Sequence, residues 1–568
     1  MPETENIIRL LPDDLINKIQ AGEVIERPAS VLKELIENSI DAGSRRITVE
    51  VSGAGRRLIR VSDDGFGMDK EDALLSLKRH ATSKLLTEAD LFNIRTMGFR
   101  GEALPSIASV SMLALTTAAK GRAAGVRIEA EAGNVKEIKD APSLGTMVEV
   151  KNLFYNTPAR LKFLKRDSTE LLHIIETATR LALSHPEVGL TLKSDGHETL
   201  DLAPASGLRE RLMQVYGAEF LEGLMEIESS SGGLSFTAFV SKRENLREGR
   251  SHQMIFINKR PVRERSLSHA VYSAYEGLLH ERHPVYFLFI EMDPKNVDFN
   301  VHPQKLEVRF KEKEAVYRFL REAVREELRG QFPETAHSSE MPGAEMPAVS
   351  EPRASFGSSR ATLPDAPRAG GEPPFEPLLL SYKTDLPFVY LGETFIALSE
   401  RGGLTIIDHH AAHERVLYER LLKGIKLQSS HLLFPRQVRL SPKEYAVILG
   451  QKEMLEEFGV QAEDFGHDTV LVRALPEALD EADIRGILSD VAGVMLEGEM
   501  PIQSLKEAVA SRMACHSSVR GRRILNSQEL GALLNDLNET EVPDACPHGR
   551  PTRVFYSLDE LKRIFKRK

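Results

Sequence analysis

An acidic and an amide side chain lie four residues apart in a stretch that the sequence predicts to be helical. Residues 28–42 repeat apolar side chains at a helical period, Pro28 suits a first helical turn, and Gly43 suits a helix end. Glu34, Asn38 and Asp41 therefore share one face of the helix. Such a face could bind a ligand, although a helical glutamate that stands alone is usually a solvated charge.

A glycine-rich acidic turn follows two short predicted strands. The strands alternate apolar and polar residues over 47–51 and 58–61, and the chain then reads Asp-Asp-Gly-Phe-Gly-Met from Asp63. Its two glycines let the backbone approach a ligand while an acid lies beside it. A Gly-X-Gly sequence alone is often only a turn. Together with the helical face, this turn indicates a nucleotide pocket.

These motifs, in this order, resemble the four-part ATP site of the GHKL ATPases, which include gyrase, the ninety-kilodalton heat-shock chaperones, sensor histidine kinases and MutL. The matching positions are Glu34, Asn38, Asp63, Gly65, Gly67, Thr82, Lys84, Gly98, Phe99, Arg100, Gly101, Glu102 and Thr146. The resemblance implies that Glu34 is the general base, that Asn38 binds Mg²⁺ and that Asp63 accepts a hydrogen bond from adenine. It also implies a lid whose backbone amides hold the ATP phosphates.

Length and composition restrict the class of protein. A chain of 568 residues predicts two to four domains. The net charge of −10 argues against a constitutively tight nucleic-acid binder, although a local basic face could still contact phosphates. No run of eighteen apolar residues and no signal peptide is evident, and two cysteines are too few for a disulfide framework. We expect a cytoplasmic, nucleoid-associated protein with no membrane partner.

Three longer motifs are more specific than the GHKL pattern. Residues 78–84 (Lys-Arg-His-Ala-Thr-Ser-Lys), 97–110 and 155–165 resemble the MutL family. The regular pattern of predicted strands and helices is interrupted near residue 205. A helix predicted at 207–216 then begins a new unit of strands and helices, which includes a helix predicted at 267–279. In the family this second domain is folded like a small-subunit ribosomal protein.

Two features of the second domain point to phosphate binding. The run from Asn296 to Phe310 resembles the MutL signature in which a lysine, here Lys305, reaches the γ-phosphate of ATP. Arg260, Arg263 and Arg265 cluster between a strand and a helix and are candidates for contact with DNA phosphates. A solvated basic patch is the alternative for these arginines.

Residues 331–384 are rich in Pro, Gly, Ser and Glu, with hardly any aliphatic side chains before Leu378. Such a segment cannot bury enough apolar surface to offset its chain entropy. We predict a flexible linker between two folded parts.

The chain after the linker carries a second set of reactive side chains. A predicted strand delivers Asp408 to the start of a helix on which His410 and Glu414 lie four residues apart. Both cysteines, Cys515 and Cys546, are next to or near histidines, and thiolate with imidazole suits zinc. A histidine-rich helix start can also be only a capped, solvated turn.

The segments around Asp408, Cys515 and Cys546 resemble the endonuclease motifs of MutL proteins that cut DNA. The match includes the Cys-Pro-His-Gly-Arg-Pro turn and a terminal Phe-X-Arg at 565–567. His409 replaces the usual Gln and His516 replaces the usual Arg. The resemblance implies that one or two metal ions, Zn²⁺ and/or Mn²⁺, are held by a shared set of ligands, with Cys515 nearby. That set is Asp408, His410, Glu414, Cys546 and His548.

The sequence therefore predicts an α/β multidomain protein. We expect a GHKL (Bergerat) ATPase α/β sandwich at 1–205, a ribosomal-protein-like α/β domain at 206–330, a linker at 331–384 and an α/β dimerisation and endonuclease domain at 385–568. The resemblance implies a homodimeric, ATP-gated clamp on double-stranded DNA that couples mismatch recognition by MutS to strand incision.

Two alternatives remain at this stage. One is an ATP-gated scaffold whose metal site is structural and which recruits a separate nuclease, and the other is a GHKL chaperone. The replication sliding clamp is a further possible partner through residues 430–435, where Ser430 replaces the usual Gln.

Overall fold

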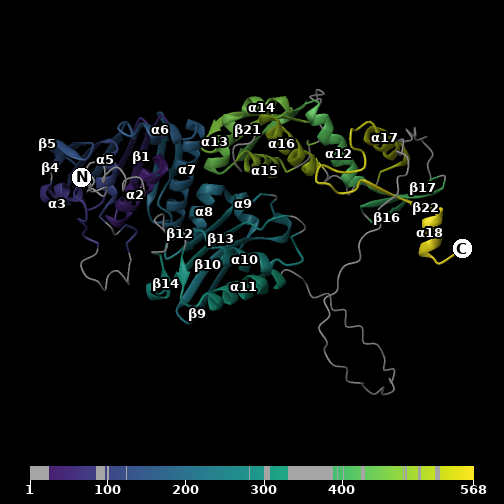
Figure 1. The fold of residues 1–568 in the computed structure, drawn as a ribbon, viewed down its shortest axis with the longest axis horizontal. Helices are drawn as coiled ribbons and strands as arrows, with labels where there is room; N and C mark the ends of the chain where they lie inside the picture. The colour runs from purple at the N-terminus through teal and green to yellow at the C-terminus, as the bar shows by residue number, and fades with distance from the viewer. Residues whose placement is uncertain are drawn as a thin grey trace, which may run out of the picture.

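The computed structural model describes residues 25–84, 96–98, 101–122, 124–247, 249–279, 282–299, 308–330, 388–392, 394–400, 402–423, 429–476, 479, 483–496, 501–517 and 525–567. These residues form two α/β units followed by a C-terminal α/β region (Figure 1). The predicted linker lies outside the described residues. Within those ranges, none of the helices combines the length and the apolar character that crossing a bilayer requires.

The first unit is built on an eight-stranded sheet with strand order β5-β4-β3-β6-β2-β1-β7-β8. Strands β1 and β7 are parallel, and the other neighbours are antiparallel. The strands are β1 (Arg46–Ser52), β2 (Leu58–Asp63), β3 (Met112–Ala118), β4 (Ala124–Glu131), β5 (Asn134–Pro142), β6 (Gly145–Lys151), β7 (Gly189–Ser194) and β8 (His197–Leu202). The helices are α2 (Pro28–Asp41), α3 (Lys70–Ser76), α5 (Ala103–Ser109), α6 (Pro158–Phe163) and α7 (Asp167–Ser184).

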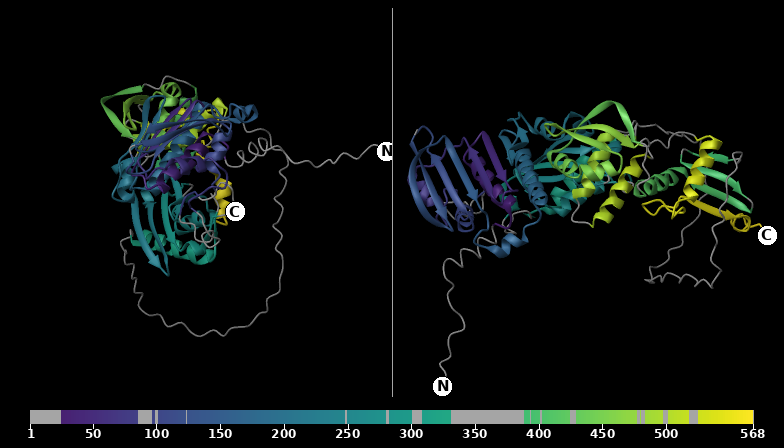
Figure 2. Two further views of the ribbon diagram at one scale, coloured as in Figure 1. Left: turned by 90° about the vertical axis from the view of Figure 1, so that its left-hand side faces the viewer. Right: turned by 90° about the horizontal axis from the view of Figure 1, so that it is seen from above.

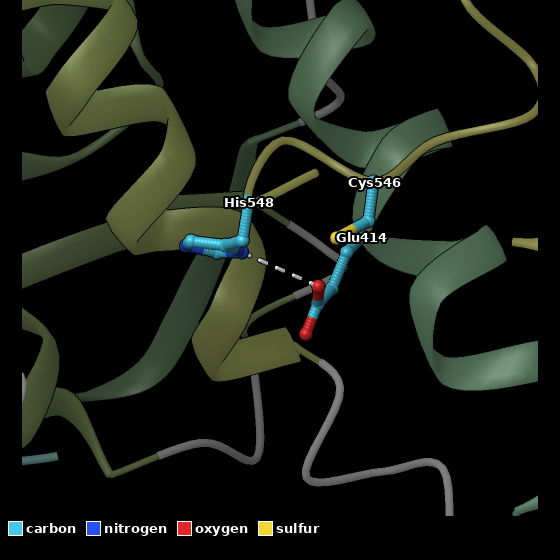
Figure 3. Close-up of side chains that lie close together, drawn as sticks. All are labelled: Glu414, Cys546 and His548. Atoms are coloured by element: carbon cyan, nitrogen blue, oxygen red, sulfur yellow. Dashed lines mark ion pairs between the residues drawn. The ribbon is translucent and has the colours of Figure 1, made fainter. Parts of the chain in front are cut away.

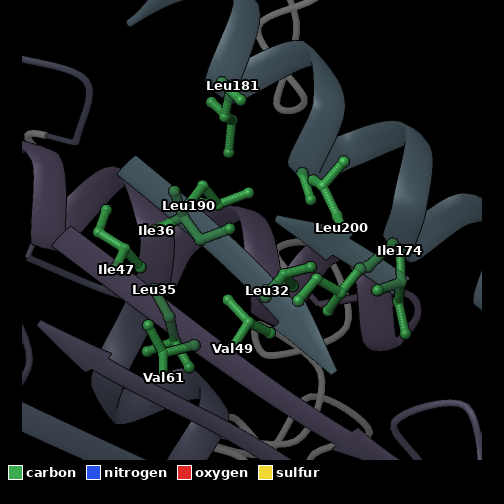
Figure 4. Close-up of a cluster of buried hydrophobic side chains, with 14 of the residues drawn as sticks. Leu32, Leu35, Ile36, Ile47, Val49, Val61, Ile174, Leu181, Leu190 and Leu200 are labelled. Carbon is green, nitrogen blue, oxygen red and sulfur yellow. The ribbon is translucent and has the colours of Figure 1, made fainter. Parts of the chain in front are cut away.

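Helices α2 and α7 pack against this sheet and form its main core. Figure 4 shows Leu32 and Leu35 of α2, Val49 of β1 and Ile174 of α7 in one cluster of buried side chains. Full burial of each such side chain stabilises a fold by about 1.5–3 kcal/mol. Because the apolar face of α2 is fixed in this core, its polar face is held in a defined orientation.

The second unit has a five-stranded sheet with strand order β12-β11-β13-β10-β9. Helices α10 and α11 pack together and share a core with the sheet. The strands are β9 (Leu224–Ser231), β10 (Leu234–Ser241), β11 (Gln253–Ile257), β12 (Arg260–Val262) and β13 (Tyr286–Met292), with a separate pair, β14 (Val297–Asp298) and β15 (Arg309–Phe310). The helices are α8 (Leu208–Tyr216), α9 (Ala218–Glu222), α10 (Arg265–Ala274) and α11 (Lys313–Gly330). The helix predicted at 267–279 thus begins earlier and ends at Ala274.

The first two units share a continuous core. Tyr216 and Phe220, from α8 and α9, belong to the same buried cluster as the α2 and α7 side chains, and so does Phe287 of β13. The ring of Tyr216 lies 4.9 Å from Phe220 and 5.1 Å from Phe287, measured between centroids. A movement of the second unit would therefore disturb the packing of the first.

The C-terminal region contains two antiparallel sheets. One has the order β16-β17-β18-β22, and the other has the order β19-β21-β20. The strands are β16 (Phe388–Leu391), β17 (Phe395–Glu400), β18 (Gly403–Asp408), β19 (Ser429–Arg439), β20 (Gln461–Gly466), β21 (Thr469–Pro476) and β22 (Arg553–Ser557). The helices are α12 (His409–Leu422), α13 (Pro442–Gly450), α14 (Lys452–Glu457), α15 (Ile484–Leu496), α16 (Ile502–Ser517), α17 (Ser527–Asn538) and α18 (Leu558–Ile564).

The two C-terminal sheets occupy different places in the molecule. Figures 1 and 2 show α13 and α15 next to the first two units, whereas β16, β17 and β22 lie at the far end. Helix α12 connects the two parts because it follows β18 directly and packs against both α16 and α17.

Candidate functional sites

A cavity of about 1590 Å³ opens beside the polar face of α2. Its lining includes ten of the sequence-predicted residues: Glu34, Asn38, Asp63, Gly67, Thr82, Lys84, Gly98, Gly101, Glu102 and Thr146. Phe99, Arg100 and Lys305 lie outside the described residues. Gly65 is not part of the lining, but its backbone N–H donates a hydrogen bond to Asp63 at 3.0 Å. The structure thus brings the helix face, the acidic turn and the lid glycines to one cavity.

Asp63, at the end of β2, is held by several donors. One carboxylate oxygen accepts from the Ser39 hydroxyl at 2.7 Å, and the other accepts from the backbone N–H groups of Gly65 at 3.0 Å and Thr146 at 3.4 Å. Burial raises the pKa of Asp63, although these hydrogen bonds oppose the shift. The carboxylate is therefore a fixed, partly desolvated acceptor at the wall of the cavity.

Lys84 forms a cationic contact with two side chains of α2. Its ammonium donates to the amide oxygen of Asn38 at 2.8 Å and to a carboxylate oxygen of Asp41 at 2.6 Å. Asp41 also accepts from the backbone N–H groups of Met97 at 3.0 Å and Gly98 at 3.1 Å. Oxygens from α2 already converge on a positive charge here, as a magnesium site requires.

Glu34 lies on the same face, one turn before Asn38, and also lines the cavity. The ammonium of Lys33 is 3.6 Å from Glu34 and 3.3 Å from Glu37. Burial lowers the pKa of Lys33, but the carboxylates of Glu37 and Glu34 outweigh it, so the pKa is raised overall. Lys33 consequently stays charged, and its ammonium holds the carboxylates of Glu34 and Glu37 in place by ion pairing.

Two glycines of the cavity occupy positions that exclude a side chain. Gly67 has φ +61°, and a Cβ atom there would be 1.9 Å from the carbonyl oxygen of Ala118. Gly101 has φ +62°, and a Cβ atom there would be 2.5 Å from the carbonyl oxygen of Ala81. Both backbone segments therefore depend on glycine to pass close to their neighbours.

Arg260 does not lie on a basic surface, so its predicted role in DNA contact is wrong for this structure. Its side chain is 6% exposed, donates to the carbonyl of Thr96 and stacks over Phe299 with its guanidinium 4.9 Å from the ring centroid. Burial lowers its pKa, opposed by nearby carboxylates of α2 including Glu37. The carboxylates of α2 therefore attract the arginine inward.

The other two predicted arginines lie on the surface. Arg263 and Arg265 are exposed, and Arg263 lies at the edge of the cavity.

A second cluster of reactive groups lies in the C-terminal region. Ligand atoms of Glu414, Cys546 and His548 all lie within 4.8 Å of one another (Figure 3). Nδ1 of His548 is 3.6 Å from Oε2 of Glu414, and the thiol of Cys515 donates to Oε1 of Glu414 at 3.8 Å. Ser511 is within 3.2 Å of the other His548 nitrogen. Carboxylate, thiol and imidazole thus converge from α12, α16 and the turn before β22.

The burial of this cluster fits a metal ion. Glu414 is 5% exposed and Cys546 is 1% exposed. Among the described residues, Oε2 of Glu414 is buried without a hydrogen-bond donor, which costs about 1–3 kcal/mol or more for a charged group unless another partner compensates. A divalent cation would supply that partner, and sulfur with imidazole favours zinc.

The other two predicted ligands are not in this cluster. Asp408 is the N-cap of α12, and one of its oxygens accepts from the backbone N–H groups of His410 and Ala411, each at 3.0 Å. The ring of His410 stacks on that of His409 at 4.3 Å. Burial, together with the neighbouring imidazoles, lowers the pKa of His413 to about 4. Asp408 thus caps α12 at a buried helix start, and the ligand roles predicted for Asp408 and His410 stay predictions.

Several contributing residues were not predicted from the sequence. Ser39 orients Asp63, and Asp41 joins the lid to α2. The guanidinium of Arg415 donates to the carbonyl of Ala545 at 2.5 Å and so fixes the turn that carries Cys546. Only Asp41 had a sequence signal, namely its place on the predicted α2 face. The other contacts join segments that are distant in sequence.

The sheet covered by α2 and α7, the acidic turn and the lid glycines define a GHKL-type ATPase. In agreement, the family described as "Histidine kinase-, DNA gyrase B-, and HSP90-like ATPase" matches residues 25–151. The family "DNA mismatch repair protein, C-terminal domain" matches residues 212–329, and "MutL C terminal dimerisation domain" matches residues 389–525.

Relatives span nearly the entire chain. The DNA mismatch repair protein MutL of Thermodesulfovibrio yellowstonii is 38% identical over 564 residues, covering 99% of this chain and 100% of the relative. That of Geotalea daltonii is 40% identical over 595 residues, covering 99% of both. The solved Aquifex aeolicus MutL ATPase domain complexed with ADP is 34% identical, covers 48% of this chain and 94% of its own, and has a TM-score of 0.37.

The chain belongs to the MutL family of DNA mismatch repair proteins. The predicted family, the α/β class, the N-terminal GHKL ATPase domain that binds ATP and the C-terminal dimerisation domain are confirmed.

Proposed function

We propose that this mismatch repair ATPase also nicks DNA, using a metal site formed by Glu414, Cys546 and His548. The observation that carries the proposal is the buried Oε2 of Glu414, which has no hydrogen-bond donor among the described residues and lies beside a thiol and an imidazole. A bound divalent ion would activate water and stabilise charge on the phosphate during hydrolysis. Ser511 would orient His548, and Arg415 would hold the turn that carries Cys546.

In the ATP cavity, we propose that Glu34 activates the attacking water and that Asn38 binds Mg²⁺ together with the ATP phosphates. Lys84 would exchange its contact with Asn38 for a phosphate when nucleotide and metal enter. Asp63 would accept a hydrogen bond from the adenine amino group, because its carboxylate is already fixed by three donors. The position of these side chains on the cavity wall supports each proposed role.

The partners are part of the same proposal. A homodimer is supported by the dimerisation family that matches residues 389–525. We propose that MutS reports the mismatch, that Arg263 and Arg265 contribute to DNA binding, and that the sliding clamp binds residues 430–435, where Leu433 and Phe434 are 89% and 79% exposed.

A structural metal site in an ATP-gated scaffold is the second candidate. The deep burial of Cys546 favours it, since structural zinc sites are closed to solvent whereas catalytic sites keep an open position. The two candidates differ in whether loss of the cluster affects DNA cleavage directly or only through folding.

Nicking of supercoiled plasmid in the presence of Mn²⁺ tests the proposal. We expect nicking by the unmodified chain and loss of at least about 99% of it in Glu414→Gln, because the amide removes the charge that would bind the ion. Glu453→Gln, an exposed carboxylate change on α14, is the matched control and should nick normally. If Glu414→Gln remains folded and nicks like the control, the scaffold is the better description.

A further inference from the structure

Part of the C-terminal region is seated on the first two units. The segment from β19 to α15, described over residues 429–476 and 483–496, is called here the β19–α15 unit. Its helix α13 lies beside α7 (Figure 1), where the ammonium of Lys443 is 2.8 Å from a carboxylate oxygen of Glu176. Arg439 donates to the backbone carbonyl of Gln214 at 2.6 Å. The contacts therefore join the unit to both α7 and α8.

A buried ion pair lies at the centre of this interface. Glu444 of α13 and His252 are 4% and 5% exposed, and Nε2 of His252 lies 3.3 Å from Oε1 of Glu444. The second oxygen of Glu444 accepts from the backbone N–H and the hydroxyl of Ser441, and the first accepts from Ser489 at 2.5 Å. Burial disfavours the charge of Glu444, but His252 and these hydrogen bonds hold its pKa far below the usual range.

The burial of Glu444 is not explained by its role in capping α13, because a helix cap does not have to be buried. Ser441 and Glu444 form a capping box, a motif that functions equally well on an exposed helix. Burying a carboxylate costs several kcal/mol unless it is paired and hydrogen-bonded. His252, from the second unit, provides the hydrogen-bonding partner across the interface. The pair therefore makes the contact between the second unit and the β19–α15 unit specific.

Arg485 of α15 makes the second buried contact. It is 9% exposed, donates to the backbone carbonyl of Tyr216 and places its guanidinium 5.2 Å from the centroid of Phe220. Ala446 of α13 packs against the core shared by the first two units. The interface thus combines an apolar contact, a cation–π contact and ionic pairs.

The same interface reaches the ATP cavity through α7. Glu176 lines the cavity together with Arg180, and their side chains are 2.5 Å apart. One carboxylate of α7 is therefore shared between Arg180, at the cavity, and Lys443, on the β19–α15 unit.

On its opposite side, the β19–α15 unit is connected through α16 to the cluster of Glu414, Cys546 and His548. Helix α16 packs on α15 and α12 within the same buried core. It carries Ser511 and Cys515, which contact His548 and Glu414. Packed side chains thus run without a break from the cavity wall to the cluster.

We propose that the surface formed by α7, α8, α9 and His252 is a docking site for the chain's own β19–α15 unit, and that docking holds the cluster of Glu414, Cys546 and His548 in a set position relative to the ATP cavity. The proposal requires neither DNA cleavage nor a bound metal, so it stands apart from the nicking activity. The partner is a segment of the same chain, recognised by a carboxylate, a lysine and two arginines.

Hydrogen–deuterium exchange on the full-length protein tests the docking. Peptides covering 208–222 and 442–450 should both be protected in the unmodified protein. Lys443→Glu, which faces Glu176 with a like charge, should increase exchange in both peptides together by about tenfold or more. Lys443→Arg, which keeps the positive charge beside Glu176, should leave both peptides protected. Lys452→Glu, at an exposed position on α14, is the matched control.

Arg439→Glu provides an independent test that does not alter the cavity wall. It removes the contact with Gln214 from an exposed side chain, so loss of the overall fold is not expected. Coupled deprotection of the two peptides in this variant supports docking. Exchange that is unaffected by both Lys443→Glu and Arg439→Glu overturns the proposal whatever the result of the nicking assay.

Discussion

The ATP cavity and the cluster of Glu414, Cys546 and His548 differ in size, in accessibility and in how the chain assembles them. The cavity is about 1590 Å³ and is lined by helix, strand and lid residues from the first unit, with Pro261 and Arg263 at its edge. The cluster consists of three side chains whose ligand atoms lie within 4.8 Å, two of them buried. The cavity suits a large ligand that must enter and leave, whereas the cluster suits a small ion that is retained.

The two sites also differ in their electrostatic state. In the cavity, Lys84 already neutralises the carboxylate of Asp41 and donates a hydrogen bond to the amide oxygen of Asn38. In the cluster, Oε2 of Glu414 lacks a hydrogen-bond donor among the described residues, and its ion pair with His548 spans 3.6 Å. We therefore expect the cavity to be stable without its ligand and the cluster to depend on its ion.

The largest expected effect is on ATP turnover. Glu34→Ala should lower kcat by about 10²–10⁴-fold, the usual contribution of a general base, and should leave ATP binding within about threefold of normal. The reason is that the change deletes the carboxylate but not the phosphate-binding backbone. Turnover and equilibrium binding on the same preparation separate the two effects, and a wild-type kcat would show that Glu34 is not the base.

Loss of the proposed ion should be the next largest effect. Cys546→Ser should lower the zinc content to well below one ion per chain and destabilise the C-terminal region, because a tight ligand of a coupled folding site is removed. Elemental analysis and thermal unfolding measure these changes. A variant that keeps its metal content and its Tm would exclude Cys546 as a ligand.

A smaller effect is expected at the adenine side of the cavity. Asp63→Asn keeps the size of the side chain but directs an NH₂ group toward one or more of the donors Ser39, Gly65 and Thr146. We expect ATP affinity to fall tenfold or more, because turning the amide to satisfy these donors leaves its NH₂ group facing the adenine amino group, and an unsatisfied buried group costs about 1–3 kcal/mol. Isothermal titration with a non-hydrolysable ATP analogue measures this. Equal affinity would mean that adenine is bound elsewhere.

The smallest effect concerns pH at the α7–α13 contact. Burial opposes the charge of Glu176, but Arg180, Lys443 and, more weakly, His173 lower its pKa from 4.5 to about 2. Because the folded-state pKa is depressed, the stabilisation is complete above about pH 4.5 and is lost as the pH falls toward about 2. The difference in Tm between the unmodified chain and Glu176→Gln should therefore shrink over that range. A difference independent of pH would contradict this assignment.

The sequence predicted the cavity better than the cluster, for physical reasons. Glu34, Asn38 and Asp41 share one helix face, so a local 3.6-residue period places them together, and the acidic turn follows directly from β2. The cluster joins α12 to a turn more than a hundred residues later, and no local period specifies that contact. His410 was predicted as a ligand because it lies four residues before Glu414, and Asp408 because it precedes the same helix, but neither side chain belongs to the cluster that the structure brings together.

The same reasoning explains the error at Arg260. Sequence alone shows three arginines between a strand and a helix, whereas the carboxylates of α2 that attract one of them inward lie more than two hundred residues earlier. The buried pair of Glu444 with His252 likewise left no sequence signal beyond a capping box.

The most direct test of the central claim is a parallel assay of Glu34→Ala and Glu414→Gln for ATP turnover and for Mn²⁺-dependent plasmid nicking. The claim is that one chain contains two separate reactive sites. We predict that Glu34→Ala loses turnover but retains basal nicking without ATP, whereas Glu414→Gln loses nicking but retains turnover within about twofold, because neither side chain contributes to the other site. A folded Glu414→Gln protein that nicks plasmid as fast as the unmodified chain would contradict the account.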